Sequence, residues 1–554
     1  MNKLFYGDNL EVLRDRTTFP DGFVDLIYLD PPFNSNAGYN VLYKDQSGRG
    51  ADSSLEAFDD TWTWGDASRA VLLDIKSGTN VALSMMMEAM HRAIGENPLM
   101  AYLAMMAVRL VELHRVLKET GSLYLHCDPT ASHYLKLVLD AVFGAEHFLN
   151  EITWKRTFAH GGARRYGPVH DTLLFYSKNG HNRWQDLKIG HDDAYVTKHF
   201  RTVDEATGER FQAISLTGAG TRRGESGQPW RSVDPTRVGR HWAIPRAIIA
   251  KEGLEAKGTI EALEALDKAG RIYWPSKEGG TSRLRWFVSD LEGARLGDVW
   301  TDIPPISAQA KERLGYPTQK PRALLERIVA ASSNPGDLVL NPFCGCGTAV
   351  DAAEKLGRRW IGIDITVIAV DLVTNRMRTG YPDATFEVIG FPKDKASAER
   401  LAERNPHQFQ QWVCGRVGGF PRDKKGGDKG VDGWFNYLTD DGDIERGVIS
   451  VKAGDNVNPN MVRDLGRVMQ RDGHRFGLFV MKGLPTKGMR DEAASQPLIE
   501  TQWGRFPALQ FVTLAELFQG IKPKLPPLVS PVKKAARVET RPSHQKGGQA
   551  TMDL

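Results

Sequence analysis

The sequence predicts an α/β protein whose main, mostly parallel sheet is assembled from two separate stretches of chain. Strand-like and helix-like segments alternate from residue 2 to about 178, and the same alternation returns at residue 316. Between them the periodicity is weak, and arginine, glycine and aromatic residues interleave. Alternating strands and helices are typical of parallel sheets with helices on both faces. The middle segment is therefore expected to be an insert.

The expected elements follow from apolar runs and from the residues that end them. In the first stretch, strands are expected at 3–7, 24–29 and 122–126, and helices at 9–16, 101–117 and 133–143. A long polar loop is expected at 34–64. In the second stretch, the expected order is a helix at 322–332, a strand at 338–340, a helix at 347–356 and a strand at 359–363.

Composition sets limits on the class of protein. A chain of 554 residues with 41% hydrophobic and 25% charged residues is expected to be globular with several domains. The net charge of +4 is compatible with nucleic acid but does not argue for it. The four cysteines are too scattered for a disulfide framework, and the pair Cys344 and Cys346 lacks the partners of a metal site. No signal peptide or membrane span is expected.

The eight residues from Asn341 to Thr348, Asn-Pro-Phe-Cys-Gly-Cys-Gly-Thr, follow an apolar strand and open a helix. Glycines let the backbone approach a ligand, and a helix N-terminus offers free N–H groups to a carboxylate. The next strand ends at Asp364, where an acidic side chain can accept hydrogen bonds from both ribose hydroxyls. The pattern predicts a cofactor site of nucleotide type. The alternative is a tight strand–helix turn without a ligand.

A second candidate site, formed by Asp30, Pro31, Pro32 and Phe33, comes directly after the strand at 24–29. The two prolines have a fixed φ and no N–H, so the turn is rigid. A carboxylate and a carbonyl held together can accept two hydrogen bonds from one NH2 group, and Phe33 offers a face for a flat base. Because ligands of open α/β sheets bind at the carboxyl ends of strands, the turn is predicted to be catalytic.

These motifs together resemble the amino-methyltransferases of DNA. The catalytic turn comes first, the cofactor motif comes late and a long insert separates them, which is the permuted β-group order of that family. Residues 316–321, Tyr-Pro-Thr-Gln-Lys-Pro, match the family's His-Pro-Thr-Gln-Lys-Pro motif, with Tyr316 in place of His. The opening Gly-Asp-Asn-Leu at 7–10 is similar to the segment after the family's third cofactor-side strand.

The resemblance implies a Rossmann-like, circularly permuted fold that binds S-adenosyl-L-methionine. In this sequence, Asp364 would hold the ribose and Asp8 would contact the adenine ring. The family's positions around the methionine part correspond to Thr318, Lys320, Asn341, Phe343, Gly345, Gly347 and Thr348.

The resemblance also implies chemistry at an exocyclic base amine. Hydrogen bonds from the amine to Asp30 and to the Pro31 carbonyl would free its lone pair to attack the sulfonium methyl, with proximity supplying much of the acceleration. Phe33 would hold the flipped base, because the amine cannot be reached inside a stacked duplex. In this family, turns that start with Asp more often act on adenine, so N6 of adenine is expected. N4 of cytosine is the alternative.

The C-terminal part resembles the Mrr-like restriction-endonuclease core, in which an Asp and an acid-or-Gln-x-Lys hold Mg²⁺ and a water. Asp432 and Lys452 match, but Ser450 replaces the acidic residue or Gln, and the helix at 406–417 carries Gln408 where the family usually has Glu. One carboxylate is a poor site for a hard cation. We therefore expect a vestigial nuclease site, with Mg²⁺ needed only if the domain still cuts DNA. A bifunctional restriction–modification protein is the alternative.

The sequence thus predicts five segments: a methyltransferase catalytic half at 1–155, a target-recognition insert at 156–300, a cofactor-binding half at 301–395, a nuclease-like domain at 400–525 and a disordered tail at 526–554. The expected partner is double-stranded DNA, since arginines suit phosphate contacts and guanine readout. The long insert argues against an RNA or protein substrate, and the intact catalytic turn argues against a dead DNA-binding protein. A cytoplasmic location in a bacterial or phage setting is expected, and a homodimer is left open.

Overall fold

The computed structural model describes residues 1–32, 64–159, 166–191, 193–274, 281–291, 293–307, 309–316, 318–422 and 430–529, with the backbone of 40–41 and 55–56. The chain forms two compact units. One consists of Met1–Gln185 with the stretch after residue 296, and the other is Asp186–Leu296. The second unit begins later than the expected insert boundary at 156, because residues 170–177 form a strand of the main sheet.

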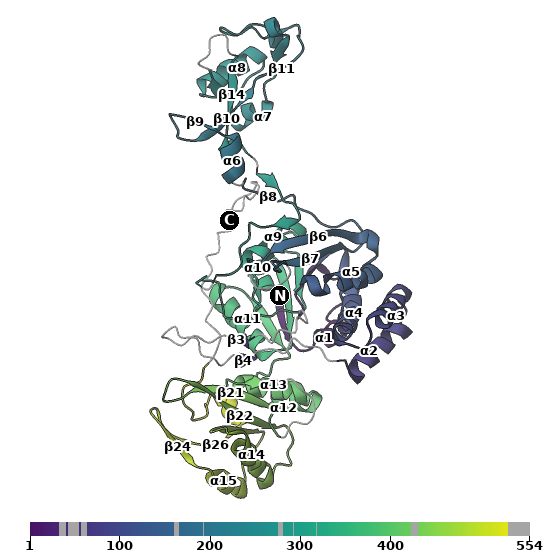
Figure 1. Ribbon diagram of the computed structural model, residues 1–554, viewed down its shortest axis with the longest axis vertical. Helices are drawn as coiled ribbons and strands as arrows, with labels where there is room; N and C mark the ends of the chain where they lie inside the picture. Colours follow the sequence, from purple (N-terminus) through teal and green to yellow (C-terminus); the bar gives the residue numbers. More distant parts are fainter. Residues whose placement is uncertain are drawn as a thin grey trace. The chain divides into compact units, whose positions relative to one another are not determined.

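The main sheet has nine strands in the order β16-β6-β7-β5-β2-β17-β18-β1-β19. Figure 1 labels two of them, β6 and β7, beside helices α5, α9 and α10. Every neighbouring pair is parallel except those made by β7, which is antiparallel to β5 and to β6, so the expected mostly parallel sheet is confirmed. The strands are β1 Asn2–Tyr6, β2 Val24–Leu29, β5 Leu117–Cys127, β6 Phe148–Lys155, β7 His170–Ser177, β16 Val299–Trp300, β17 Leu338–Asn341, β18 Arg359–Asp364 and β19 Phe386–Ile389.

Helices cover both faces of this sheet, so its central strands are apolar on both sides. On β2, Leu26 and Tyr28 point into one core cluster, whereas Ile27 and Leu29 point into the other. The first cluster includes residues of α9 Arg322–Ser332, α10 Thr348–Lys355 and α11 Val367–Gly380. The second is packed by α1 Asn9–Arg14, α2 Asp66–Ser77, α3 Val81–Ile94, α4 Pro98–Val116 and α5 Pro129–Phe143.

The two sequence stretches join at the centre of the sheet. Strand β2 pairs in parallel with β17, and β1 inserts between β18 and β19. Buried Asp25 fixes the first junction, because its carboxylate accepts hydrogen bonds from the Leu338 backbone N–H at 3.0 Å and from Lys118 Nζ at 2.8 Å. The carboxyl ends of β2, β17, β18 and β1 consequently lie at one edge.

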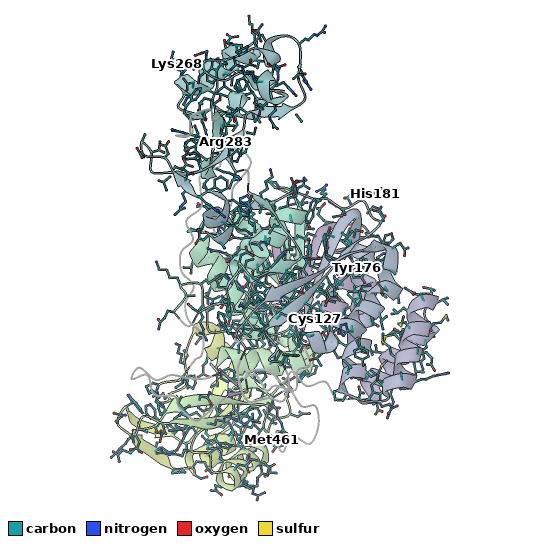
Figure 2. The ribbon with its side chains drawn as sticks, turned by 45° about the horizontal axis from the view of Figure 1, so that its top comes forward. Cys127, Tyr176, His181, Lys268, Arg283 and Met461 are labelled. Atoms are coloured by element: carbon teal, nitrogen blue, oxygen red, sulfur yellow. The ribbon has the colours of Figure 1, made fainter. Side chains whose placement is uncertain are left out.

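The unit Asp186–Leu296 has its own small core and an antiparallel four-stranded sheet in the order β13-β14-β10-β9. Trp230 and Trp242 lie in this core, and Figure 2 marks Arg283 and Lys268 at its surface. Its main elements are α6 Asp193–His199, β9 Thr202–Val203, β10 Arg210–Ser215, α7 Arg246–Lys251, α8 Thr259–Lys268, β13 Ile272–Tyr273 and β14 Arg283–Phe287.

The C-terminal part carries a five-stranded mixed sheet in the order β20-β21-β22-β23-β26. Residues 527–529, at the start of the expected tail, pair with β21, and 530–554 lie outside the described residues. The elements are α12 Lys395–Arg404, α13 Pro406–Arg416, β20 Phe420–Pro421, β21 Gly433–Leu438, β22 Ile444–Lys452, α14 Pro459–Asp472, β23 Gly477–Met481, α15 Lys487–Ala494, β26 Leu509–Thr513 and α16 Leu514–Gln519.

Two features, a membrane-spanning helix and a cluster of metal-ligating residues, are absent from the described part of the chain. Within the described residues, no helix combines the length and apolar character needed to cross a bilayer. The same part of the chain contains no group of three or more His, Cys, Asp or Glu residues placed to hold a metal ion. Cys344 and Cys346 are buried free thiols, and burial raises the pKa of each.

Replacing Asp351 by Ala should strongly destabilise the main domain. Its buried carboxylate accepts hydrogen bonds from Arg376 and from the Tyr381 hydroxyl, and the variant leaves a buried guanidinium without its partner. Breaking one half of such a pair costs about 3–5 kcal/mol, measurable by chemical denaturation. Asp66→Ala is the control, because it removes only the exposed ion pair with Arg69 and should leave stability unchanged. Equal stability of Asp351→Ala and wild type would contradict the role of the pair.

Candidate functional site

The turn between β17 and α10 has the conformation that its glycines predict. Gly345 and Gly347 have φ angles of 51° and 78°, in the left-handed region that side chains disfavour. A Cβ on Gly347 would lie 2.7 Å from Val373 Cγ2, and one on Gly345 would lie 3.3 Å from the Tyr316 ring. Larger residues are therefore disfavoured by backbone conformation at both positions and by crowding at Gly347. The turn brings bare backbone to the sheet edge.

Asp364 lies at the end of β18 beside this turn. Its carboxylate accepts a hydrogen bond from the Gly345 backbone N–H at 2.8 Å and two more from the backbone and hydroxyl of Thr366. Burial outweighs these bonds and raises the pKa of the Asp364 carboxyl. The cofactor motif and the acidic residue that the sequence paired with it are thus in direct contact.

Asp30 ends β2 next to β17, and its carboxylate is held by a cation. Lys320 Nζ donates to both carboxylate oxygens, at 2.9 and 2.7 Å. The side chains of Asp30 and Lys320 are only 16% and 9% exposed, so water screens this pair little. Lys320 was expected near the methionine carboxylate, whereas the structure places its ammonium group on the carboxylate of Asp30.

Tyr316, the residue that replaces the family's His, lies between the two motifs. Its ring packs over Gly345. Burial raises the pKa of its hydroxyl well above the ordinary value, and the nearby carboxylates of Asp364 and Asp30 act in the same direction. The hydroxyl is therefore neutral and close to both acidic residues. The cofactor motif and the Asp-Pro-Pro turn, far apart along the sequence, share one edge of the sheet.

Asp8 is already engaged within the protein. Its carboxylate caps α1 by accepting from the Leu10 N–H at 2.7 Å, and Arg109 Nη2 donates to both of its oxygens. Arg109 also binds Asn9, whose Nδ2 donates to the Pro342 carbonyl at 2.7 Å. These bonds tie the β1–α1 turn to the cofactor motif. Asp8 therefore has a structural role that the sequence did not reveal.

The other predicted cofactor residues lie on the same two segments. Buried Asn341 accepts from the Phe343 backbone N–H at 3.1 Å, which stabilises the start of the turn. Thr348 opens α10, and its hydroxyl accepts from Arg376. Thr318 lies two residues before Lys320 and is partly buried. Phe33, the predicted base-stacking residue, lies outside the described residues.

Sequence reasoning missed a buried polar chain behind the catalytic turn. The Tyr28 hydroxyl lies 2.9 Å from His126 Nδ1, and His126 Nε2 lies 3.1 Å from the Asp171 carboxylate. Arg156 forms an ion pair with the other oxygen of Asp171. Burial raises the pKa of Asp171, but the hydrogen bond from His126 and the charges of Lys320 and Arg156 outweigh it and leave the pKa lowered. Tyr28 precedes Asp30 by two residues, so this chain fixes the strand that leads to Asp30.

The nuclease-like residues have a different arrangement from the one expected. Asp432 accepts a hydrogen bond from the Val451 backbone N–H at 2.7 Å and another from Gln410 Nε2 at 3.0 Å. The residue facing Asp432 from the helix is therefore Gln410 and not Gln408, because the two side chains leave α13 in different directions. An uncharged amide occupies the position opposite the carboxylate.

A cavity of about 350 Å³ adjoins this site. Ser450 and Lys452 line it, together with Asp464 and Arg467 of α14, and Met461 of the same helix is marked in Figure 2. Asp432 is not among the lining residues.

A sequence profile of the DNA methylase family matches residues 24–375, well over half of the chain. The chain belongs to the N6/N4 DNA methylase family. This confirms the family that its motifs indicate. A restriction endonuclease profile matches residues 401–504, so the expected second domain of this methylase is confirmed as well.

The methylase is similar to several known proteins. It is 28% identical over 380 residues to the type II methyltransferase M.EcaI of Enterobacter cloacae, covering 68% of this chain and 70% of the relative. It is 39% identical over 114 residues to the DNA adenine methyltransferase YhdJ of Escherichia coli, covering 20% of this chain and 38% of YhdJ. The protein TTHA0409 of Thermus thermophilus, solved with S-adenosyl-L-methionine, is 16% identical, covering 70% and 98% of the two chains with a TM-score of 0.32.

Several arginines of the methylase's Asp186–Leu296 unit have structural partners. Arg271 forms a buried ion pair with Asp290, and Arg285 binds Asp204. Arg231 binds Asp267 and lies over the Trp230 ring. These side chains stabilise the unit itself, so the arginine content of the unit is explained at these positions without a contact to DNA.

Proposed function

We propose that this methylase transfers the methyl group of S-adenosyl-L-methionine to the exocyclic N6 of adenine in duplex DNA, after flipping the base out of the helix. The observation that carries the proposal is the shared sheet edge. There, Asp30 follows β2 and the Gly345 turn follows the neighbouring β17. Lys320 binds the Asp30 carboxylate, and the Tyr316 ring packs over Gly345. With the proposed sites for the methyl acceptor and the methyl donor at one edge of the sheet, the two reactants are held close together, as the transfer requires.

The residues at this edge fit the cofactor. Gly345 and Gly347, with their positive φ angles, bring bare backbone to the sheet edge, and Asp364 presents carboxylate oxygens suited to ribose hydroxyls. Residues Asn341, Phe343 and Thr348 complete the turn around the methionine end. When bound, the cofactor supplies an electrophilic methyl group on a sulfonium centre.

The chain's own contribution to the reaction is the positioning of the amine. Asp30 and the Pro31 carbonyl accept the two amine hydrogens, which localises the lone pair on nitrogen. Lys320 keeps the carboxylate oriented and partly neutralises it, so Lys320 acts as a positioning residue for Asp30. A base bound there must leave the duplex, and Phe33 is placed by the sequence to stack on it.

Adenine is favoured over cytosine by two points. The turn begins with Asp30, the residue more often found with adenine in this family. The related YhdJ, 39% identical over 114 residues, is named as a DNA adenine methyltransferase. We assign recognition of the DNA sequence to the Asp186–Leu296 unit, whose length and separate core suit a target-recognition domain.

For the C-terminal domain, we propose DNA binding without cleavage. A hard cation requires charged oxygen ligands, yet Gln410 offers an amide to Asp432 and Ser450 offers no charge. The Asp432 oxygens are already engaged by Val451 and Gln410. Lys452 and Arg467 supply positive charge to the cavity beside them.

Incubating the protein with tritiated cofactor should label duplex DNA and leave RNA unlabelled. Mass spectrometry of the digested DNA should then find N6-methyldeoxyadenosine. The matched control is Asp30→Ala, which removes one amine acceptor and should lower the rate by about 10²–10³-fold or more. Cofactor binding by this variant should persist. N4-methylcytosine in the digest would instead establish the cytosine alternative.

The affinity for S-adenosyl-L-methionine should fall as the pH decreases. The ribose hydroxyls bind the ionised Asp364, so binding lowers its pKa, and protons compete with the cofactor below the raised pKa of the free protein. The affinity should therefore begin to decline at a pH above the pKa range of an ordinary aspartate, and it should fall by at most tenfold per pH unit. Titration calorimetry from about pH 8 to pH 5 measures it. Asp364→Asn should bind more weakly and lose the trend; an equally steep trend in that variant would refute the assignment.

Incubation with unmethylated DNA and Mg²⁺ or Mn²⁺, without cofactor, should produce no cuts. The physical reason is the shortage of charged ligands around Asp432. DNA affinity should nevertheless fall in Lys452→Ala, as read by fluorescence anisotropy. Cuts that disappear in Lys452→Ala would overturn the proposal and show a bifunctional protein.

A further inference from the structure

The nuclease-like domain contacts the methylase sheet at the carboxyl end of β1, the edge at which the proposed cofactor site lies. Helix α13 approaches α11 so closely that a Cβ on Gly415 would lie 2.5 Å from Val367 Cγ1. The buried Tyr6 hydroxyl, at the end of β1, donates to the Gln408 carbonyl at 3.1 Å. Phe409 and Trp412 belong to the same core cluster as Leu4 and Val367. The nuclease-like domain and the methylase domain therefore share one hydrophobic core at this contact.

The side chain of Gln408 lies at this contact. It is only 4% exposed, and its Nε2 has no hydrogen-bond partner among the described residues. A Cβ on Gly7 would lie 3.7 Å from that nitrogen. An unpaired buried amide is unfavourable, so its position next to Gly7 calls for a partner.

The position of Gly7 indicates what that partner is. Gly7 follows β1, and its N–H donates to the Asp364 carbonyl at 3.0 Å, so β1 ends beside the ribose-binding aspartate. On the other side of β18, the Gly345 turn takes the methionine end. The methionine part is attached at C5′ and the base at C1′, on opposite sides of the ribose, so a ribose on Asp364 with its methionine end at the Gly345 turn directs its base towards β1.

An adenine base at the end of β1 needs hydrogen-bonding partners. Asp8, the expected adenine contact, is ion-paired with Arg109, and an ionised carboxylate can only accept hydrogen bonds, so it has no donor for the ring nitrogens of adenine. A glutamine amide pairs well with adenine, because its NH2 and carbonyl match N7 and the exocyclic amine. We infer that Gln408, contributed by the nuclease-like domain, binds the adenine ring of the methylase's cofactor. This inference rests on the proposed function, which supplies the cofactor.

The test is Gln408→Met, which keeps the length and volume of the side chain and removes the amide. Titration calorimetry with S-adenosylhomocysteine and with 5′-methylthioadenosine should show about three- to tenfold weaker binding of both, since the lost contact is to the base they share. Gln408→Glu, isosteric but without the NH2 donor, should weaken both as well.

The matched control is Gln410→Met on the same helix, whose amide faces Asp432 instead. It should bind both compounds as the wild type does. The unfolding temperature of the free Gln408→Met protein should equal or exceed that of the wild type, because an unpaired buried amide has been removed. Weaker binding without loss of stability separates cofactor recognition from a structural role.

The outcomes are distinguishable. If the wild type binds neither compound, the cofactor assignment fails and this inference fails with it. If the wild type binds both and Gln408→Met binds them equally well, or if Gln410→Met weakens binding to the same extent, this inference alone is wrong.

Discussion

The parallel pairing of β2 with β17 is the interaction on which the rest of the structure depends. One strand comes from the start of the chain and the other from beyond residue 337, and Asp25 fixes their register through the Leu338 N–H. Successive side chains of a strand point to opposite faces of the sheet, so a one-residue shift in the register of β2 would move Leu26 and Ile27 each into the other core cluster. With the register fixed, the turns that follow both strands must emerge side by side.

The electrostatics of the site follow from that arrangement. Two carboxylates, Asp30 and Asp364, lie at one partly buried edge, where like charges would repel. Lys320 compensates the first, and backbone N–H groups from Gly345 and Thr366 compensate the second. Tyr316 remains a neutral spacer between them. Each carboxylate thus has its own hydrogen-bond donors, which suits the two separate roles proposed for them, binding the base amine and binding the ribose.

The sequence predicted the local parts of this protein well. The expected bounds of β2 and α9 agree with the structure, because Pro31 and Pro321 mark their ends. The glycine turn was predicted for the same reason, since its conformation is local. Long-range pairs could not be predicted: Lys320 reaches Asp30 across 290 residues, and Tyr6 reaches Gln408 across 402. Likewise, only folding shows that Gln410, and not Gln408, faces Asp432, since both positions suit the start of one helix.

The two strands that flank the Asp186–Leu296 unit, β7 before it and β16 after it, both pair with β6. These three strands lie at the side of the main sheet far from β1. The pairing of β2, β17 and β18 therefore does not depend on what the unit contains. The unit can be lengthened, shortened or exchanged without changing the strands that precede Asp30 and the glycine turn.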